Sequence, residues 1–178
     1  DEEGNSFDPS GNEVDIKKYF YSNGEISKDP QRDAEYTRML GDKIVESYHR
    51  EALVFSSQIL AFAAFRIIKS RYSKMDVYGL MRLPAEDLII KPKELMDAVG
   101  KLVERLREMR ENGEIQLEQE IIDGRISDIV KKGIANLGIY HAKLPLMYNL
   151  EGDFESQDIK ILYFYHNRLE GYGLHKYI

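Results

Sequence analysis

The chain has 178 residues, of which 43% are hydrophobic and 31% are charged, and its formal net charge is −6. These values are ordinary for a globular domain, and the length is sufficient to bury a core without disulfides or a structural metal. No cysteine occurs, which excludes a disulfide framework and any thiolate catalytic or metal-binding site.

The negative charge is concentrated at the start of the chain. The six acidic residues before Lys17 equal the whole net charge, so the rest of the chain is balanced to about zero. Because nucleic-acid binding needs a basic excess, this balance argues against a nucleic-acid partner. Turn-forming pairs such as Gly11-Asn12 indicate that residues 1–26 form an irregular acidic segment, with a short strand at Val14 to Ile16.

Residues 27–178 are predicted to form a mainly α domain, a multi-helix orthogonal or bundle arrangement with at most one or two short strands. The first helix begins near Ser27 to Asp29, because Pro30 suits the first turn of a helix. One apolar stripe follows it at a spacing of four residues. Its members are Tyr36, Leu40, Ile44 and Tyr48.

The second helix is predicted from about Ser57 to Tyr72. Its apolar run, Ile59–Phe65, covers every face of the helix, so neighbouring elements must surround it. A bilayer-spanning helix needs about 20 apolar residues. The run is therefore interpreted as a core helix.

Two further helices are predicted in the middle of the chain. Asp76 caps a short helix from Val77 to Leu83, and Pro92 begins a longer helix that ends at Asn112-Gly113. Apolar residues recur every three or four positions along the longer helix, which predicts one buried face. They are Leu95, Val99, Leu102, Leu106 and Met109.

The last third of the chain alternates short extended and helical segments. Glu114–Glu118 alternates polar and apolar residues, which is typical of a short strand or an extended link. Ser127-Asp128 is predicted to cap a helix that ends at Gly138. Ser156 is predicted to cap the last helix, Ile159–Leu169.

No catalytic motif can be assigned from the sequence. None of the four histidines, His49, His141, His166 and His175, is followed five residues later by an aspartate, so a His-x4-Asp acyl-transfer pair is absent. Nucleophile-elbow, dinucleotide and phosphate-loop motifs are also absent, as is a His-Glu-x-x-His zinc motif. We therefore predict no catalytic residue, no metal site and no cofactor.

Two segments remain as binding candidates. Four basic residues, Arg66, Lys69, Arg71 and Lys74, lie within nine positions that contain no acid, and they are candidates for contact with a membrane surface or a phosphate. The simpler interpretation is a solvated helix end whose charges oppose the helix dipole. The aromatic run Leu162–Tyr165 is a candidate for binding an acyl chain, with core packing as the simpler interpretation.

Three sequence blocks together resemble the C-terminal region of bacterial glycerol-3-phosphate acyltransferases. The first is Gln31–Thr37, in the helix that runs into His49–Glu51. The second is Ser56–Phe65, continuing to Asp76–Pro84, and the third is Leu162–Gly173, with the sequence LYFYHNRLEGYG. In their order and spacing the blocks cover nearly the whole chain from about residue 13.

The resemblance implies phospholipid biosynthesis, by acyl transfer to the 1-hydroxyl of glycerol 3-phosphate. In that family a His-x4-Asp motif supplies the base and a Phe-Pro-Glu-Gly block helps to hold phosphate, and this chain contains neither. The chain is therefore expected to be a helical accessory domain, inactive alone. Its expected partners are the acyltransferase catalytic domain of the same polypeptide, lying before Asp1, and an anionic surface on the cytoplasmic side of the inner membrane.

Two other functions stay open at this stage. One is a free-standing helical interaction module that presents a groove to a partner helix. The other is a small-molecule binding bundle that uses the tyrosine and histidine residues. An accessory domain should expose an apolar patch, whereas a binding bundle should enclose a pocket.

Overall fold

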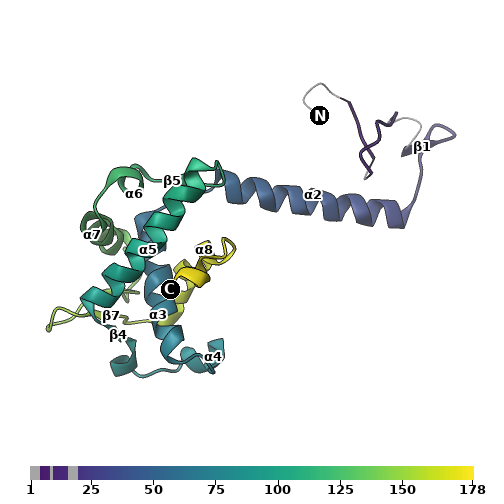
Figure 1. Ribbon diagram of the computed structural model, residues 1–178. Coiled ribbons are helices and arrows are strands. Elements are labelled where there is room, and N and C mark those ends of the chain that lie inside the picture. Colours follow the sequence, from purple (N-terminus) through teal and green to yellow (C-terminus); the bar gives the residue numbers. More distant parts are fainter. Residues whose placement is uncertain (1–4, 9, 16–19) are drawn as a thin grey trace. The chain divides into compact units, whose positions relative to one another are not determined.

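The computed structural model describes residues 5–8, 10–15 and 20–178 of the chain (Figure 1). The described residues form seven α-helices, seven two-residue strands and two short 3₁₀ helices, so the mainly helical class is confirmed. The helices are α2 (Pro30–Glu51), α3 (Ser56–Arg71), α4 (Val77–Leu80), α5 (Pro92–Glu111), α6 (Gln119–Asp123), α7 (Ile126–Asn136) and α8 (Ile159–Glu170). The strands are β1 (Tyr21–Ser22), β2 (Glu25–Ile26), β3 (Leu53–Val54), β4 (Ile89–Ile90), β5 (Gln116–Leu117), β6 (Met147–Tyr148) and β7 (Phe154–Glu155).

The chain divides into two compact units, residues 1–47 and residues 48–178. The predicted boundary after residue 26 stays a prediction. Within the first unit, β1 and β2 form an antiparallel hairpin. Its turn places Asn23 at φ 55° and Gly24 at φ 84°, and these two positive φ values match the right-handed twist of the strands. Of the predicted strand at Val14 to Ile16, Ile16 lies outside the described residues, and Glu13 makes an isolated antiparallel bridge with Phe7.

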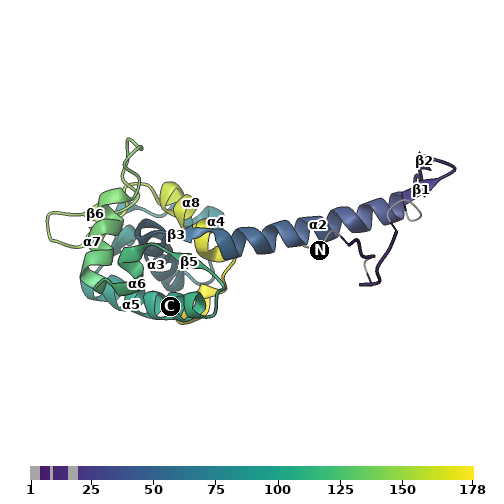
Figure 2. The ribbon, with the colours of Figure 1, turned by 90° about the horizontal axis from the view of Figure 1, so that it is seen from above.

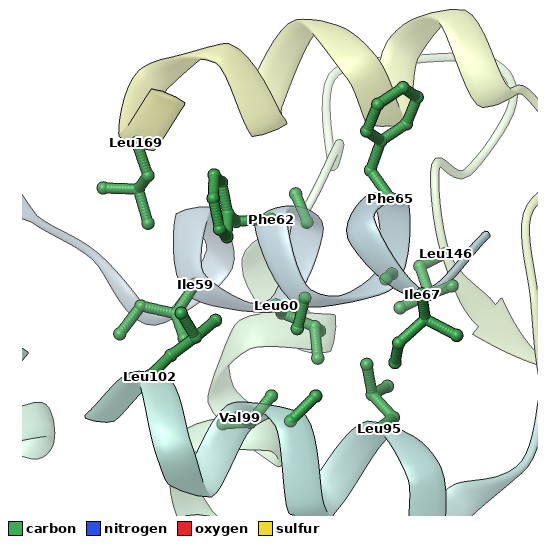
Figure 3. Close-up of a cluster of buried hydrophobic side chains, with 14 of the residues drawn as sticks. Ile59, Leu60, Phe62, Phe65, Ile67, Leu95, Val99, Leu102, Leu146 and Leu169 are labelled. Atoms are coloured by element: carbon green, nitrogen blue, oxygen red, sulfur yellow. The ribbon is translucent and has the colours of Figure 1, made fainter. Parts of the chain in front are cut away.

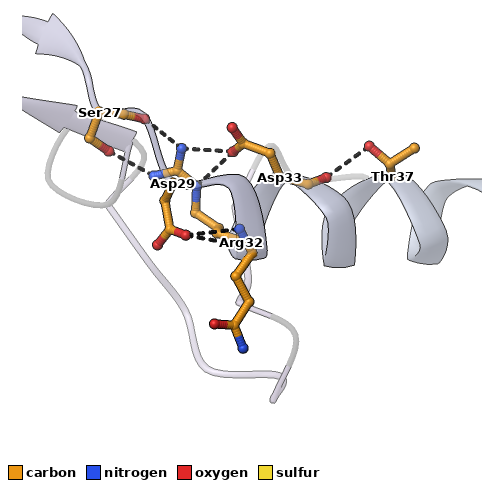
Figure 4. A network of polar contacts seen from close by, with 6 residues as sticks. Ser27, Asp29, Arg32, Asp33 and Thr37 are labelled. Carbon is orange, nitrogen blue, oxygen red and sulfur yellow. Dashed lines mark hydrogen bonds and ion pairs between the residues drawn. The ribbon is translucent and has the colours of Figure 1, made fainter.

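A polar network fixes the start of α2 in the first unit (Figure 4). The Asp29 carboxylate accepts hydrogen bonds from the backbone N–H groups of Gln31 and Arg32, and so caps the helix. The Arg32 guanidinium donates to the carbonyl and hydroxyl oxygens of Ser27, each at 2.7 Å, and pairs with Asp33 at 2.8 Å. The predicted helix start at Ser27 to Asp29 is therefore confirmed.

The second unit is organised around α3, which α5, α7 and α8 surround (Figure 2). Nine apolar residues of α3 are buried, from Ile59 to Ile68, in agreement with the run that is apolar on every face. Phe62 and Phe65 face α8, whereas Ile59 and Leu60 lie toward α5 and α7 (Figure 3). Each such side chain contributes roughly 1.5–3 kcal/mol of hydrophobic burial. The predicted stripe of α5 faces this helix and is buried throughout.

Short strands tie the helices of the second unit together. β3 pairs in parallel with β5, in the extended segment predicted after α5, and β4, β7 and β6 form an antiparallel sheet. Each pairing involves only two residues on each strand, so the strands act as connections between helices. The sequence predicted at most one or two short strands, whereas the described residues form seven strands of two residues each.

Two predicted helix caps are wrong. The last helix is capped by Asp158, whose carboxylate accepts from the backbone N–H of Lys160 at 2.9 Å, while Ser156 lies before the helix and donates its backbone N–H to Leu88. Helix α7 begins at Ile126, ahead of the predicted cap at Ser127-Asp128, and Asp128 pairs instead with Arg125 at 2.8 Å. The short helix after Asp76 is also shorter than predicted, since α4 ends at Leu80.

One ionised side chain joins three segments of the second unit. The Glu118 carboxylate accepts from the backbone N–H of Ser56 at 3.2 Å and from its hydroxyl at 2.8 Å, and it pairs with Lys132 at 2.7 Å. Burial of the carboxyl group raises its pKa, but the hydrogen bonds from Lys132 and Ser56 together outweigh burial and lower the pKa below the ordinary value of 4.5. The Glu118 carboxylate, which lies just before α6, therefore accepts the hydrogen bonds of the first residue of α3.

Glu118→Gln is expected to lower the free energy of unfolding by roughly 1 kcal/mol at pH 7, because two charge-assisted hydrogen bonds become neutral ones. Since the folded pKa is lowered, the contribution of the charge is present above pH 4.5 and is lost as pH falls through the folded pKa. Urea denaturation at pH 7 and pH 3 measures both effects. A difference between the wild type and the variant that is as large at pH 3 as at pH 7 would contradict this account.

Candidate functional site

The four basic residues predicted to contact a membrane or a phosphate do not share one face. Arg66 and Lys69 are half-buried beside His166 and disfavour its protonated form, whereas Arg71 donates to the carbonyl oxygen of Ile89 and to Glu94, both at 2.6 Å. Lys74 is exposed in the turn after α3. Arg71 is thus used to join α3 to α5. The role of the four residues in membrane or phosphate contact stays a prediction.

The aromatic run of the last helix is divided between the core and the surface. Leu162 is fully buried, and the Tyr163 ring packs 5.0 Å from the Phe65 ring. Phe164 is exposed, and the Tyr165 hydroxyl lies 3.3 Å from Nε2 of His141. Leu162 and Tyr163 therefore pack against the core, as the simpler interpretation expected, while binding of an acyl chain by the run stays a prediction.

A pocket of about 380 Å³ lies in the second unit where the end of α2, β3 and the end of α8 meet. Its volume is at the small end of the range for ligand sites. Gln58 and Leu53 bring α3 and β3 to the pocket, and Arg168 brings α8. The lining residues are Tyr48, His49, Ala52, Leu53, Val54, Gln58, Asn167, Arg168, Leu169 and Tyr172.

His49 is held in this pocket by the C-terminal end of α8. Its backbone carbonyl accepts from the Tyr172 hydroxyl at 2.9 Å, and the two rings pack with centroids 5.1 Å apart. Burial raises the pKa of Tyr172, which favours the protonated hydroxyl that this contact needs. A Cβ at Gly171 would lie 3.0 Å from His49 Nε2, so the glycine leaves the room that the imidazole occupies.

Several polar side chains line the pocket, among them Gln58 and Arg168. Gln58 Oε1 accepts from the backbone N–H of Phe55 at 3.3 Å, and since that N–H can only donate, the Nε2 donors of Gln58 remain. Arg168 also lines the pocket, and its guanidinium carbon lies 5.9 Å from the centre of the Phe164 ring, which is not part of the lining. The lining contains no acidic residue, although the chain carries a net charge of −6.

An exposed apolar rim borders the pocket. In β3, Val54 is buried and the neighbouring Leu53 is 43% exposed, because successive side chains of a strand point to opposite sides. Phe55 is also 43% exposed, and Tyr48 is 70% exposed. We call Tyr48, Leu53 and Phe55 the β3 rim. Large exposed apolar side chains grouped in this way are typical of interaction surfaces.

A histidine–carboxylate pair also exists, but it lies outside the pocket lining. His166 is buried, stacked on the Phe62 ring at 4.8 Å, and its Nε2 lies 3.0 Å from Glu170 Oε2 without the alignment of a hydrogen bond. Burial lowers the His166 pKa, and the Glu170 charge opposes this effect only in part. The histidine in the pocket and the histidine beside a carboxylate are thus two different residues.

The lowered pKa of His166 predicts a stability that depends on pH. A histidine that stays neutral in the folded protein makes its full contribution to the free energy of unfolding above its ordinary pKa of 6.5. This contribution is lost as the pH falls toward the pKa of the folded state. The wild type is therefore expected to lose stability below pH 6.5, whereas His166→Phe, which keeps the stacking on Phe62, should show a flatter profile. Urea denaturation between pH 7.5 and 5 measures this, with His175→Gln at an exposed position as the control. Equal slopes in the wild type and His166→Phe would contradict the assignment.

The sequence did not predict the pocket, although two of its residues were noted there. The sequence marks His49 as a histidine without a following aspartate and Tyr48 as the end of an apolar stripe, and it includes Gln58 and Arg168 only as members of the second and third resemblance blocks. Among the described residues, no cluster of three histidine, aspartate or glutamate side chains is placed to hold a metal ion. None of the described helices is long and apolar enough to span a bilayer. No protein-family model, curated protein or solved structure matches the chain.

Proposed function

We propose that this chain is a noncatalytic helical accessory domain of a membrane-associated glycerol-3-phosphate acyltransferase. The full-length enzyme would transfer an acyl group to the 1-hydroxyl of glycerol 3-phosphate. The observation that carries the proposal is that the three sequence blocks on which the resemblance rests meet at one pocket. His49 comes from the helix of the first block, Gln58 from the second, and Arg168 and Tyr172 from the third.

The β3 rim is the proposed contact surface for the catalytic domain of the same polypeptide. Tyr48, Leu53 and Phe55 expose apolar area beside the pocket, and the packed core behind them holds β3 in place through its pairing with β5. Covering such a patch releases hydrophobic free energy of about 25 cal/mol per Å². A domain docked there would place the pocket at the junction.

The test is to add the chain to an acyltransferase domain that lacks its helical C-terminal region. The chain alone is expected to transfer no acyl group from a thioester to glycerol 3-phosphate, and the mixture is expected to form a complex with raised activity. Tyr48→Asp should abolish the complex, whereas Tyr78→Asp, at a side chain that is 79% exposed outside the rim, should not. Activity of the chain alone, or equal effects of the two substitutions, would refute the proposal.

A second function is favoured by the apolar stripe of α2 in the first unit. This helix contains no buried residue, and its stripe includes Leu40, 60% exposed, and Ile44, 45% exposed. Such a stripe suits a helical interaction module that binds a groove or a partner helix. If Leu40→Asp removed the complex with the acyltransferase domain and Leu53→Asp, at a rim residue outside the stripe, did not, the interaction module would replace the accessory domain of the β3 rim.

A further inference from the structure

We infer that Asn23, in the turn between β1 and β2, is a site of spontaneous deamidation and isoaspartate formation in the folded protein. This covalent modification belongs to the first unit and does not depend on the proposed accessory role. The four-residue sequence NGEI occurs twice in the chain, as Asn23–Ile26 and as Asn112–Ile115. The two copies have the same chemistry, so the fold around each copy decides which of them reacts.

The reaction is an attack of the Gly24 backbone nitrogen on the side-chain carbonyl carbon of Asn23. The attacking nitrogen loses its proton to water and forms a bond to Cγ. The bond between Cγ and Nδ2 breaks, and Nδ2 takes up a proton and leaves as ammonia. Water, the only co-reactant, then opens the cyclic succinimide at either of its carbonyl carbons. One opening gives aspartate, and the other gives isoaspartate, whose main chain runs through the former side chain.

The freedom of the backbone decides the rate at an Asn-Gly pair. Glycine has no side chain, so the approach of its nitrogen to the asparagine is open in both copies. Asn23 and Asn112 are both exposed, so access to water does not distinguish them either. The attack also requires rotation about the Cα–C bond of the asparagine. Hydrogen bonds and packing that fix this bond must open before the reaction can occur.

The backbone around Asn23 is held weakly. β1 and β2 have two residues each, and all of these residues are exposed, including Ile26 at 66%. A two-stranded hairpin of this kind is at best marginally stable by itself. In the described part of the chain, neither the Asn23 side chain nor the Gly24 backbone N–H makes a hydrogen bond. Asn23 also has φ 55°, a conformation that residues other than glycine adopt rarely, so opening of the turn relieves strain.

The second copy is fixed by the end of α5. The Gly113 backbone N–H, which would have to attack, donates to the carbonyl oxygen of Arg110 at 3.0 Å. Nδ2 of Asn112, the leaving group, donates to Glu114 Oε1 at 3.0 Å. Ile115 is 1% exposed, so the residues after the glycine are anchored in the core of the second unit. Reaction at Asn112 therefore has to wait until the end of this helix opens.

The modification should change the hairpin that carries it. Either product replaces a neutral amide by a carboxylate, in a segment that is already acidic. Isoaspartate also adds a methylene group to the main chain of the turn. A two-residue turn sets the register of its strands, so the pairing of Ser22 with Glu25 should be lost in the isoaspartate form.

Peptide mapping by mass spectrometry tests the assignment on the full chain. The folded protein is incubated at neutral pH, and trypsin then releases residues 19–28 with Asn23 and residues 111–125 with Asn112. Asn23 should deamidate about tenfold or more faster than Asn112, because only Asn112 has to wait for a helix to open. Labelling with an isoaspartyl methyltransferase and S-adenosylmethionine should mark the Asn23 peptide and leave the Asn112 peptide unmarked.

The same incubation in concentrated urea is the control. With the fold removed, the two NGEI copies should deamidate at similar rates, and Asn112 should become labelled. Equal rates at the two sites in the folded protein would overturn the inference, as would an Asn23 that reacts only in urea. A difference that persists in urea would also overturn it, because the fold would then not be its cause. The accessory role is unaffected by any of these results, since the assay contains no acyltransferase domain.

Discussion

Phe62→Ala is expected to lower the free energy of unfolding by about 3–5 kcal/mol, the range for removing a buried aromatic side chain. Phe62 is 0% exposed, and its ring is stacked on His166 at an angle of 4°. Alanine would leave a cavity between α3 and α8 that the surrounding helices fill only in part. Urea denaturation followed by circular dichroism measures the loss.

The matched control for this substitution is Phe164→Ala on α8. Phe164 is 55% exposed, so its removal should change the free energy of unfolding by less than about 1 kcal/mol. The same experiment tests the position of α3 in the middle of the second unit. Similar losses at Phe62 and Phe164 would mean that α3 is not enclosed as described.

Helices α3 and α5, the two longest elements of the second unit, were predictable because the pattern of their apolar residues shows which of their faces are buried. Ile59–Phe65 is apolar on every face, which requires neighbours on every face, and α5 shows a single stripe from Leu95 to Met109. Helix α6 was not predicted because its five residues are too few to show a periodic pattern. It is stabilised by hydrogen bonds from another helix. Arg107 of α5 donates to the carbonyl oxygens of Ile121 at 2.7 Å and Gly124 at 2.8 Å. A long-range contact of this kind leaves no local pattern.

The pocket could not be predicted for a related reason. Its donors lie in helices that the sequence predicts separately, and no residue pattern states that the end of α2 packs on the end of α8. That junction depends on Gly171, which the sequence includes only as a member of the third resemblance block. In the structure the absence of its side chain leaves room for His49. The cap of the last helix was predicted wrongly for a different reason. Ser156 and Asp158 are both residue types that cap helices, and the pairing of β7 with β4 decides which of them lies at the start of α8.

Gly133→Ala is expected to lower the free energy of unfolding by about 1–2 kcal/mol, although alanine is the better helix former. Gly133 lies in α7 where this helix crosses α3, and a Cβ there would meet the carbonyl oxygen of Ser56 at 2.9 Å and the Leu60 side chain at 3.2 Å. Overpacking of this kind costs about 1–3 kcal/mol, and the gain in helix propensity offsets up to about 1 kcal/mol of it. Gly133→Val should cost more, since it adds two methyl groups at the same contact.

Gly100→Ala is expected to change the free energy of unfolding in the opposite direction. Gly100 lies within α5, and a Cβ there meets no atom within 4 Å, so only the gain in helix propensity remains. That variant should be more stable than the wild type by roughly 0.5–1 kcal/mol. The two variants carry the same chemical change in helix interiors, so the difference in sign isolates the close approach of α7 to α3. If Gly133→Ala stabilised the protein as Gly100→Ala does, α7 would have to lie farther from Ser56, and the N-terminus of α3 that Glu118 caps would be packed differently.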